Sequence, residues 1–333
     1  MQVKPSTWPG AEPYVDVMVA DEVRDGVDLT HLDQPLADDP DVTKRQLVDY
    51  LDAMATRLLP ALSDRPLSVV RVRPGQPPFM QKNLPKYAPG WIRTAPYWAE
   101  RSKRTVNYPL CDDRRTLLWL ANQRAVEYHP ALFRVADEAH ATHLVLDVDP
   151  PPDAGFDVVV SATLLIKQAL DETGLAGAVK TSGAKGVHVF VPIAPVDAET
   201  AAAATRALAA RAERHDPALA TTAFVVEERE GRVFLDSTRA GGATVAAAYS
   251  PRLRPGLPVS FPVSWDALPG VVPADFTVAS VPRMVGDADP WAESQPPPQV
   301  LPDELIDEGR AIPVARVQAM HAGLRRAREQ RDQ

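Results

Sequence analysis

The sequence predicts an α+β fold, built as one domain with two lobes or with an appendage. Three observations carry this prediction. The 333 residues exceed the ~250–300 that one hydrophobic core normally serves. Short runs typical of strands are interspersed with stretches of helical periodicity. The segment from His143 to Pro192 holds two such strands around a helix and gathers carboxylates, a lysine and glycines, so we expect the other elements to be arranged around it.

Composition restricts the class of protein. An apolar content of 45% is ordinary for a soluble globule, and the N-terminus shows no basic segment followed by an apolar one. No run approaches the ~20 apolar residues of a membrane span, so we expect a cytoplasmic protein without membrane contact. The single cysteine, Cys111, excludes an internal disulfide framework and a zinc ribbon. Any catalytic metal must then have oxygen ligands, which favours Mg²⁺ or Mn²⁺.

Charge is unevenly distributed along the chain. The net charge of −8 argues against a protein that coats nucleic acid indiscriminately. Residues 65–104, however, carry nine basic residues against one acid, Glu100, which predicts a local basic surface. The nine are Arg65, Arg71, Arg73, Lys82, Lys86, Arg93, Arg101, Lys103 and Arg104.

The N-terminal part begins with an acidic stretch, residues 1–41. An apolar run from Tyr14 to Val19 and a turn at Asp25-Gly26 predict a hairpin here. The residues Asp41 to Lys44 offer an N-cap, and apolar residues then recur at helical spacing from Leu47 to Leu59. We expect this helix to pack on a sheet.

A strand over Leu67 to Val72 leads into Pro77 to Trp98, which is dense in prolines, aromatics and cations. So many prolines exclude a long helix, so the segment must be extended or looped. Aromatics between cations suit single-stranded nucleic acid, where stacking contributes roughly 1–3 kcal/mol per base. We expect nucleic-acid contact for Phe79 and Lys82. Hairpin core is the more common role for the other aromatics, and we favour it for Trp91, Tyr97 and Trp98.

The next stretch reads as a hairpin, a helix and a strand. Ala99 to Arg104 has the composition of an exposed hairpin tip, and the chain returns through Val106 to Leu110. The pair Asp112-Asp113 caps a helix that ends near Gln123. A short strand follows and ends at His129. A histidine at a strand end is usually structural, but this one could face the same cleft as the acids described next.

Two carboxylates end the first strand of the central segment. Leu144 to Val148 is an apolar run that alternates with Asp147 and Asp149 and stops at three prolines. Side chains at i and i+2 of a strand share a face, about 6.8 Å apart, so both carboxylates can reach a pair of hard cations. A lone pair of this kind is weak evidence, and we give a metal site about even weight against a surface role on this motif alone.

A glycine-rich turn, Lys180 to Gly186, precedes the second strand, Val187 to Val191, and a helix from about Val158 to Leu170 separates the two strands. The turn does not fit the phosphate-binding pattern G-x-x-x-x-G-K-[ST], and a strand follows it rather than a helix. Together, however, an acid pair and a Lys/Ser/Gly turn supply what phosphoryl transfer needs: metal ligands and a cradle for a triphosphate.

The remaining motifs lie further along. Ala198 to Arg214 is an alanine-rich helix, and Arg232 to Arg239 is a strand that ends in Asp236, the third carboxylate that a metal site needs. An extended segment then presents Arg252 and Arg254, which suit a polyphosphate. The end of the chain reads as a proline-rich linker, Pro296 to Pro302, and an Arg-rich amphipathic helix, Val314 to Arg328.

Six motifs in this order resemble the polymerase domain of bacterial ligase D, a member of the archaeo-eukaryotic primase superfamily. The resemblance runs from about residue 28 to residue 292. The motifs are PPFMQKNLPK, TLLWLANQRAVEYHP, LVLDVDP, KTSGAKGVHVFVP, VFLDSTR with AAYSPRLRPG, and DFTVASVPRMVGDADPW.

The resemblance implies an RRM-like antiparallel catalytic sheet flanked by helices, beside a smaller N-terminal α/β lobe. It implies a primase-polymerase domain over 1–292, divided into an N-terminal lobe with a DNA-binding segment (1–110) and a catalytic core (111–292). The linker and C-terminal helix would occupy 293–333. The implied activity is templated nucleotidyl transfer from nucleoside triphosphates at gapped or broken duplex DNA, with two Mn²⁺ or Mg²⁺ ions and commonly with ribonucleotides.

The resemblance also assigns residues. The metal-binding and catalytic residues would be Asp147, Asp149 and Asp236. The residues around the incoming nucleotide would be His129, Ser182, Lys185, His188, Arg239, Arg252 and Arg254. Phe79 and Lys82 match a template-contacting segment, and Lys44 matches a position that reads the 5′-phosphate across a gap. From the basic segment we add Lys86, Arg101, Lys103 and Arg104 as DNA-binding.

Three positions depart from the family pattern. Gln34 stands where relatives have a lysine, which predicts a weak grip on a 5′-phosphate. Met80 replaces an aromatic and stacks less well on a base. Gly241-Gly242 holds no cation where relatives often carry one, which predicts lower triphosphate affinity.

Two alternatives remain open at this point. One is a catalytically silent module that binds DNA ends and recruits repair enzymes; the other is a transferase with a nucleotide-sugar donor. Three clustered carboxylates without a metal would be costly, which argues against the silent module. The chain has no ligase nucleophile motif K-x-D-G, so we expect a stand-alone polymerase that works with a separate DNA ligase and an end-binding protein.

Overall fold

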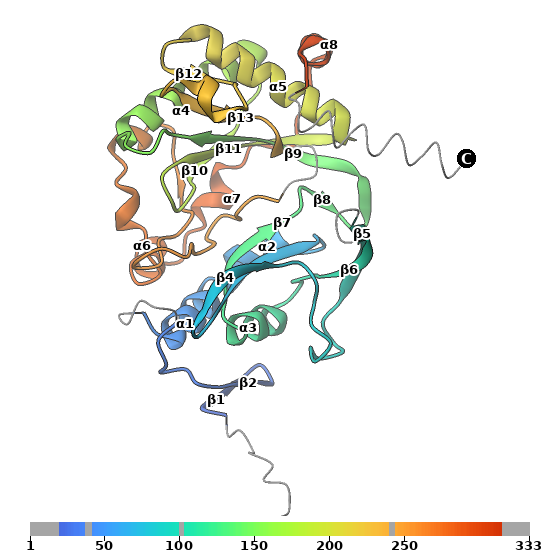
Figure 1. The fold of residues 1–333 in the computed structure, drawn as a ribbon, viewed down its shortest axis with the longest axis vertical. Helices are drawn as coiled ribbons and strands as arrows, with labels where there is room; N and C mark the ends of the chain where they lie inside the picture. The colour runs from blue at the N-terminus through green and yellow to red at the C-terminus, as the bar shows by residue number, and fades with distance from the viewer. Residues whose placement is uncertain (1–19, 37–41, 100–102, 240–243, 315–333) are drawn as a thin grey trace, which may run out of the picture.

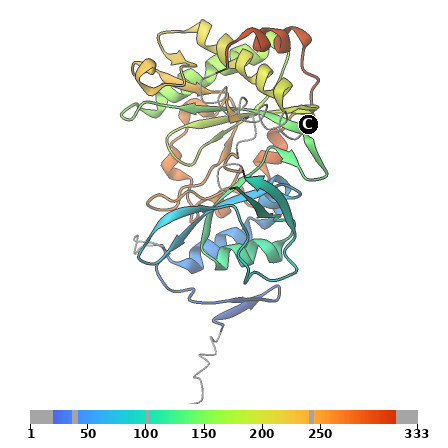
Figure 2. The same ribbon diagram turned by 45° about the vertical axis from the view of Figure 1, so that its right-hand side comes forward.

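The computed structural model describes residues 20–36, 42–99, 103–239 and 244–314. These residues form two lobes stacked along the long axis of the molecule (Figure 1, Figure 2). One hydrophobic core cluster includes residues of both lobes, among them Leu118 in the N-terminal lobe and Leu146 in the C-terminal lobe. The two lobes of the described residues therefore share a core, and the N-terminal lobe extends to residue 130 rather than to residue 110, the boundary expected from the sequence.

The N-terminal lobe combines three helices with short antiparallel strands. Their bounds are β1 (Glu22–Arg24), β2 (Val27–Leu29), α1 (Lys44–Ala53), α2 (Ala55–Leu62), β3 (Leu67–Arg73), β4 (Gln76–Gln81), β5 (Thr94–Ala99), β6 (Arg104–Pro109), α3 (Arg114–Asn122) and β7 (Ala125–Pro130). Strands β4, β3 and β7 form a three-stranded sheet in that order, while β1 with β2 and β5 with β6 form separate hairpins. Both α2 and α3 contact β7.

Helix α1 starts where the sequence predicts. The hydroxyl of Thr43 accepts a hydrogen bond from the backbone N–H of Gln46, whose side chain accepts one from the N–H of Thr43. The single helix predicted to continue to Leu59 is wrong, because the chain breaks at Met54 and restarts as α2. Leu51 of α1 and Leu58 of α2 are both fully buried.

The predicted hairpins are present in the described residues. The turn at Asp25-Gly26 joins β1 to β2, whereas the run from Tyr14 to Val19 lies outside the described residues. Of the three aromatics predicted as hairpin core, Trp91 and Tyr97 are partly buried. The prediction is wrong for Trp98, which is 48% exposed. Successive side chains of a strand point to opposite faces, so Trp98 points away from the packed face of β5 on which Ala95 is buried.

The C-terminal lobe is a mainly antiparallel sheet covered by two long helices. Its elements are β8 (Phe133–Arg134), β9 (Asp137–Asp149), α4 (Phe156–Thr173), β10 (Ala178–Thr181), β11 (Val187–Asp197), α5 (Ala198–His215), β12 (Ala220–Thr221), η1 (Val226–Arg229), β13 (Val233–Asp236) and β14 (Pro262–Val263). The strand order is β12-β13-β9-β11-β10-β14, with β8 pairing to β9. Helices α4 and α5 cover the side away from the N-terminal lobe (Figure 1). The other face of the sheet is thus turned toward that lobe.

Short elements complete the described chain: η3 (Leu268–Gly270), η4 (Pro273–Asp275), α6 (Val281–Val285), α7 (Pro290–Ser294) and α8 (Asp303–Ala311). None of the described helices is both long and apolar enough to cross a membrane.

The proline-rich stretch predicted as a linker is part of the C-terminal lobe, so that prediction is wrong. The backbone of Gln299 exchanges hydrogen bonds with Pro192 and Ala194 of β11. Helix α8 follows and packs on α5, where Glu308 pairs with Arg211 over 2.6 Å. Prolines that cannot continue a helix still suit an edge position beside a strand. The helix predicted over Val314 to Arg328 lies, apart from its first residue, outside the described residues.

Candidate active site

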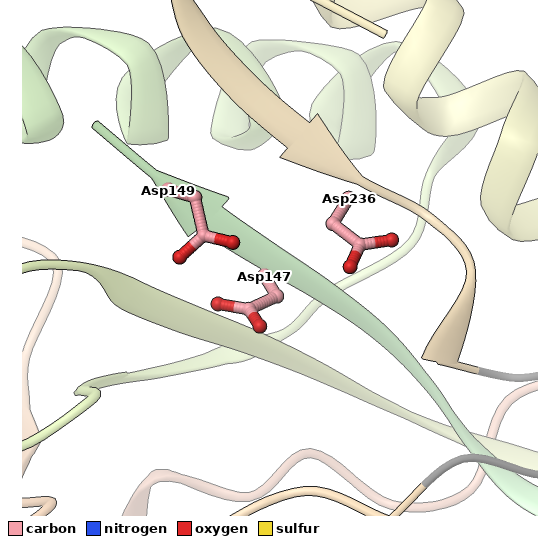
Figure 3. Close-up of side chains that lie close together, drawn as sticks. All are labelled: Asp147, Asp149 and Asp236. Carbon is pink, nitrogen blue, oxygen red and sulfur yellow. The ribbon is translucent and has the colours of Figure 1, made fainter. Parts of the chain in front are cut away.

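Three carboxylates converge on the face of the C-terminal sheet that is turned toward the N-terminal lobe. In the strand register, Asp147 on β9 lies opposite Asp236 on β13 and opposite His188 on β11. Asp149 lies two residues further along β9 and therefore shares the face of Asp147. Figure 3 shows the side chains of Asp147 and Asp149 reaching from one strand and that of Asp236 from its neighbour. One oxygen of each acid lies within 4.8 Å of the others.

A glycine sets the close approach of the strands at this end. A Cβ atom on Gly186 would lie 2.2 Å from the carbonyl oxygen of Val148, well inside van der Waals contact. The turn before β11 can therefore lie against the end of β9 only with glycine at this position. The predicted Lys/Ser/Gly turn and the acid pair are brought together by this contact.

The donor set fits a hard divalent cation. It consists of carboxylate oxygens, the ligands that Mg²⁺ and Mn²⁺ favour. Burial and the neighbouring charge of Asp147 raise the pKa of Asp149 to about 6, as expected where acids are crowded together without enough positive charge nearby. One guanidinium supplies part of that charge: Nη2 of Arg239 donates to Asp147 over 2.8 Å and lies 3.1 Å from Asp236.

A buried chain of polar groups supports Asp147 from behind. The ammonium of Lys180 contacts Nδ1 of His188 at 2.7 Å and donates to the hydroxyl of Ser260. Burial and Lys180 lower the pKa of His188 to about 4, so the ring is neutral at pH 7. Because the carboxylate of Asp147 only accepts hydrogen bonds, the ring proton lies on Nε2, which is 3.3 Å from Asp147, and Nδ1 accepts from Lys180. Burial would raise the pKa of Asp147, but His188 and Arg239 hold it below its usual value.

A pocket of about 600 Å³ opens over the acids. Cationic side chains line it beside Asp147 and Asp149, and the Nε of Arg239 is buried there without a hydrogen-bond acceptor. An unpartnered buried donor indicates a site that receives an anion. The lining cations are Lys185, Arg229, Arg232, Arg239, Arg252 and Arg254.

The turn before β11 forms one wall of this pocket. The hydroxyl of Ser182 accepts hydrogen bonds from the backbone N–H groups of Ala184 and Gly186, which fixes the turn. The guanidinium of Arg252 donates to the carbonyl of Ser182. The side chain of Lys185 is exposed and reaches the carbonyl of Pro152 across the pocket. The turn thus joins two cations to the end of β9.

Most residues predicted around a nucleotide line this one pocket. Ser182, Lys185, His188, Arg239, Arg252 and Arg254 all do so. The exception is His129, which is buried on β7 and is bonded to Glu127 rather than lining the pocket. Its strand end faces the C-terminal lobe but does not reach the acids' cleft.

Sequence reasoning missed two arginines of the pocket wall. Arg229 and Arg232 lie in and just after η1, a single turn with no helical or strand periodicity to mark it. Arg229 lies 3.8 Å above the ring of Phe234 and donates to two backbone carbonyls, so its guanidinium is fixed in place. The only signal in the sequence was two arginines close before the strand that ends in Asp236.

The residues predicted to contact DNA are not equivalent in the structure. Lys82, Lys86, Lys103 and Arg104 are exposed, whereas Arg101 lies outside the described residues.

Phe79 and Met80, the two residues predicted to meet a template base, are neighbours on β4. Phe79 is partly exposed, with the guanidinium of Arg73 4.8 Å from its ring centre. Met80 is 48% exposed. Both side chains therefore remain accessible to a nucleic-acid strand.

Lys44 differs, because it is only 3% exposed. Its ammonium donates to the carbonyl of Thr30 and to Asn122, both at 2.6 Å. A phosphate would have to displace these partners to reach it. Gln34, the position that departs from the family pattern, accepts a hydrogen bond from Arg124. The Gly241-Gly242 turn lies outside the described residues.

A second hollow, of about 230 Å³, lies between the lobes. Its floor is apolar, and three arginines line its wall. Each of these guanidiniums already donates to a backbone carbonyl, which identifies them as ties between segments. They are Arg57, Arg65 and Arg134.

Comparison with known proteins gives consistent results. The family described as "LigD, primase-polymerase domain" matches residues 43–291. The bifunctional non-homologous end joining protein LigD of Bacillus subtilis is 30% identical over 259 residues, which cover 76% of this chain and 41% of that protein. The multifunctional non-homologous end joining DNA repair protein LigD of Mycobacterium tuberculosis H37Rv is 33% identical over 254 residues, 73% of this chain and 33% of that protein. The chain thus spans less than half the length of these relatives.

A solved structure is similar over most of the chain. It is the polymerase domain of Mycobacterium tuberculosis ligase D in complex with DNA, with a TM-score of 0.74 and 31% identity. The match covers 80% of this chain and 96% of that one.

Proposed function

Because the chain belongs to the LigD primase-polymerase domain family, we propose that it is a DNA-directed nucleotidyltransferase that extends primers and fills short gaps at DNA breaks. The α+β fold is of the archaeo-eukaryotic primase type, as expected from the sequence. The observation that carries the proposal is the acid triad of Asp147, Asp149 and Asp236 beside a pocket lined by cations. A polyanionic substrate and a metal-dependent transfer both fit this combination.

Two Mn²⁺ or Mg²⁺ ions held by the triad would lower the pKa of the primer 3′-hydroxyl and neutralise charge on the reacting phosphate. The side chains of this chain do the remaining work. Arg252 and Arg254 face the pocket from one segment and Lys185 from the turn before β11, so they can bind the triphosphate from two sides. Positive charge there also stabilises the pyrophosphate as it leaves.

The N-terminal lobe is proposed to hold the DNA. Lys82 and Lys86 are exposed beside β4, and Lys103 and Arg104 are exposed at the start of β6. These cations are placed to follow a phosphate backbone, and Phe79 on β4 is placed to stack on a template base. Tyr87 and Trp98 are also exposed in the same lobe, and they add two aromatic rings beside Phe79.

The finer features of the activity are proposals for this chain. The relatives named for non-homologous end joining support a role in joining broken DNA, with a separate DNA ligase and an end-binding protein as partners. We also propose a preference for ribonucleotides and Mn²⁺. Since Gln34 is held by Arg124 and Lys44 is buried, we propose only a weak dependence on a downstream 5′-phosphate.

The test is extension of a labelled primer on a short-gapped duplex with Mn²⁺. Ribo- and deoxynucleotides are compared, with and without a 5′-phosphate on the downstream strand. Templated addition, little changed by the phosphate and faster with ribonucleotides, supports the proposal. No addition while the duplex is still bound would instead support a silent end-binding module. Absence of both binding and addition would favour a sugar-nucleotide transferase.

A further inference from the structure

Glu127 is a buried carboxylate of the N-terminal lobe that contacts the nucleotide pocket. It lies on β7 and is 9% exposed. Its Oε1 accepts a hydrogen bond from the backbone N–H of Leu253 over 2.9 Å. Its Oε2 lies 2.8 Å from Nε2 of His129 and 3.1 Å from Nε of Arg252. Two of these three groups belong to the C-terminal lobe, so one carboxylate spans the boundary between the lobes.

The contact fixes a side chain of the pocket. Glu127 holds Arg252 at its Nε side. The contact is an ion pair rather than a hydrogen bond, since the N–H of Nε does not point at the carboxylate oxygen. At the other side, its Nη1 donates to the carbonyl of Ser182. The stem lies so close to Gly183 that a Cβ atom there would be 2.5 Å from Cγ of Arg252. The guanidinium is thus held between the lobes in one orientation.

The role of His129 also follows from this contact. A carboxylate only accepts hydrogen bonds, so His129 donates to Glu127 through Nε2. Burial would raise the pKa of Glu127, but His129, Arg252 and the N–H of Leu253 hold it at about 2, so the carboxylate is charged at neutral pH. The histidine that sequence reasoning placed at the nucleotide therefore shares Oε2 of Glu127 with Arg252.

We propose that Glu127 is a positioning residue: it orients Arg252 for the triphosphate and links the DNA-holding lobe to the nucleotide pocket. The proposal rests on the proposed function, since it names how a cation of that site is placed. The link is short, because β7 pairs with β3, which in turn pairs with β4, the strand that carries Phe79. His129 acts in the same way, by supporting Glu127.

The test is a double-mutant cycle of Glu127→Gln and Arg252→Gln, with KM for the nucleotide, kcat and equilibrium binding of a fluorescent ATP analogue as readouts. Gln keeps the shape of Glu127 but removes the charge that orients Arg252. For Glu127→Gln we expect KM and the analogue Kd to rise about tenfold, kcat to fall because Arg252 also faces the leaving pyrophosphate, and DNA affinity to stay little changed. The double variant should be no worse than Arg252→Gln alone, because both changes remove the same interaction. Glu172→Gln, an exposed glutamate on α4, is the matched control and should behave as wild type.

The outcomes separate this inference from the proposed function. A wild-type protein that neither binds the analogue nor extends a primer overturns both. An active wild type whose KM is unaffected by Glu127→Gln, or strictly additive losses in the cycle, overturns the positioning role alone. If Glu127→Gln does not fold, Glu127→Leu combined with Arg252→Leu removes both buried charges. That double variant must match Arg252→Leu in KM; a higher KM contradicts the inference.

Discussion

Asp147 and Asp149 illustrate what single residues reveal in a sequence. Their spacing on an apolar strand requires that they share a face, and this part of the site was predicted from the residues themselves. Asp236 was predicted less directly, from its position at a strand end. Arg229 and Arg232 were not predicted as pocket residues, because Arg229 lies in a turn of four residues that has no periodicity and Arg232 lies just after it. Glu127 was also missed, since its partner Arg252 is distant in the sequence.

The crowding of the acids predicts a gain of stability when one charge is removed. In buffer with EDTA, Asp149→Asn should raise the free energy of unfolding by about 1 kcal/mol, because Asp149 is repelled by Asp147 and Asp236. Wild-type protein should melt at a higher temperature when Mn²⁺ is added, and the variant should lose most of this shift. Thermal unfolding with and without Mn²⁺ measures both effects.

Asp153→Asn is the matched control, since Asp153 is exposed in the turn that follows β9. It should leave both melting temperatures unchanged. A variant Asp149→Asn that is less stable in EDTA, and that still responds fully to Mn²⁺, would show that Asp149 is not part of a metal site.

His143 predicts a dependence of stability on pH. Burial, with Arg65 and Arg134 nearby, lowers its pKa to about 3, against an unfolded value of roughly 6.5. Between these values the unfolded chain binds one more proton, so the contribution of His143 is complete above pH 6.5 and is lost as pH falls. The slope for one proton is at most about 1.4 kcal/mol per pH unit.

The substitution His143→Gln removes the group that binds this proton in the unfolded chain. Denaturant unfolding at pH 7 and pH 4.5 should therefore show a smaller loss of stability for the variant than for the wild type. Equal losses in the two proteins would mean that His143 is protonated in the folded state as readily as in the unfolded one.

Among the elements, length decided what could be predicted. The helices α4 and α5 are long and strongly patterned and were predicted close to their observed bounds. Strands β9 and β11 were predicted only over their apolar parts, Leu144 to Val148 and Val187 to Val191. Strands β12 and β14 have two residues each, which is too short for a period, and they exist only because distant strands pair with them. Helix α8 was missed because prolines before it indicated a linker, and its partner α5 lies about a hundred residues earlier.

The packing of α8 predicts that it stabilises the catalytic lobe. Leu305 on α8 is 1% exposed, so Leu305→Ala should lower the free energy of unfolding by about 2–5 kcal/mol. Val300→Ala is the matched control in the same stretch, because Val300 is 82% exposed, and it should cost nothing measurable. Denaturant melts of the three proteins provide the comparison. Equal stability of Leu305→Ala and wild type would show that α8 does not stabilise the lobe, and the stretch would then be an appendage.

At the scale of the whole molecule, length alone left open one domain with two lobes or a domain with an appendage, and the arrangement of the lobes could not be predicted. Their contact depends on pairs far apart in sequence, such as the hydroxyl of Tyr50, which donates to the carbonyl of Tyr249. The same boundary carries the link from Glu127 to Arg252. Local patterns cannot show such contacts, because they depend on the folded position of both partners.

The measurement that tests the central claim most directly uses Asp147→Ala, with Asp153→Ala as control, on one labelled gapped duplex. Primer extension with Mn²⁺ and the DNA dissociation constant are measured on the same preparations. Because the acids hold the metals and the N-terminal lobe holds the duplex, Asp147→Ala should lose extension completely while its DNA affinity stays near that of the wild type. Extension by Asp147→Ala at the wild-type rate would contradict the assignment of the active site.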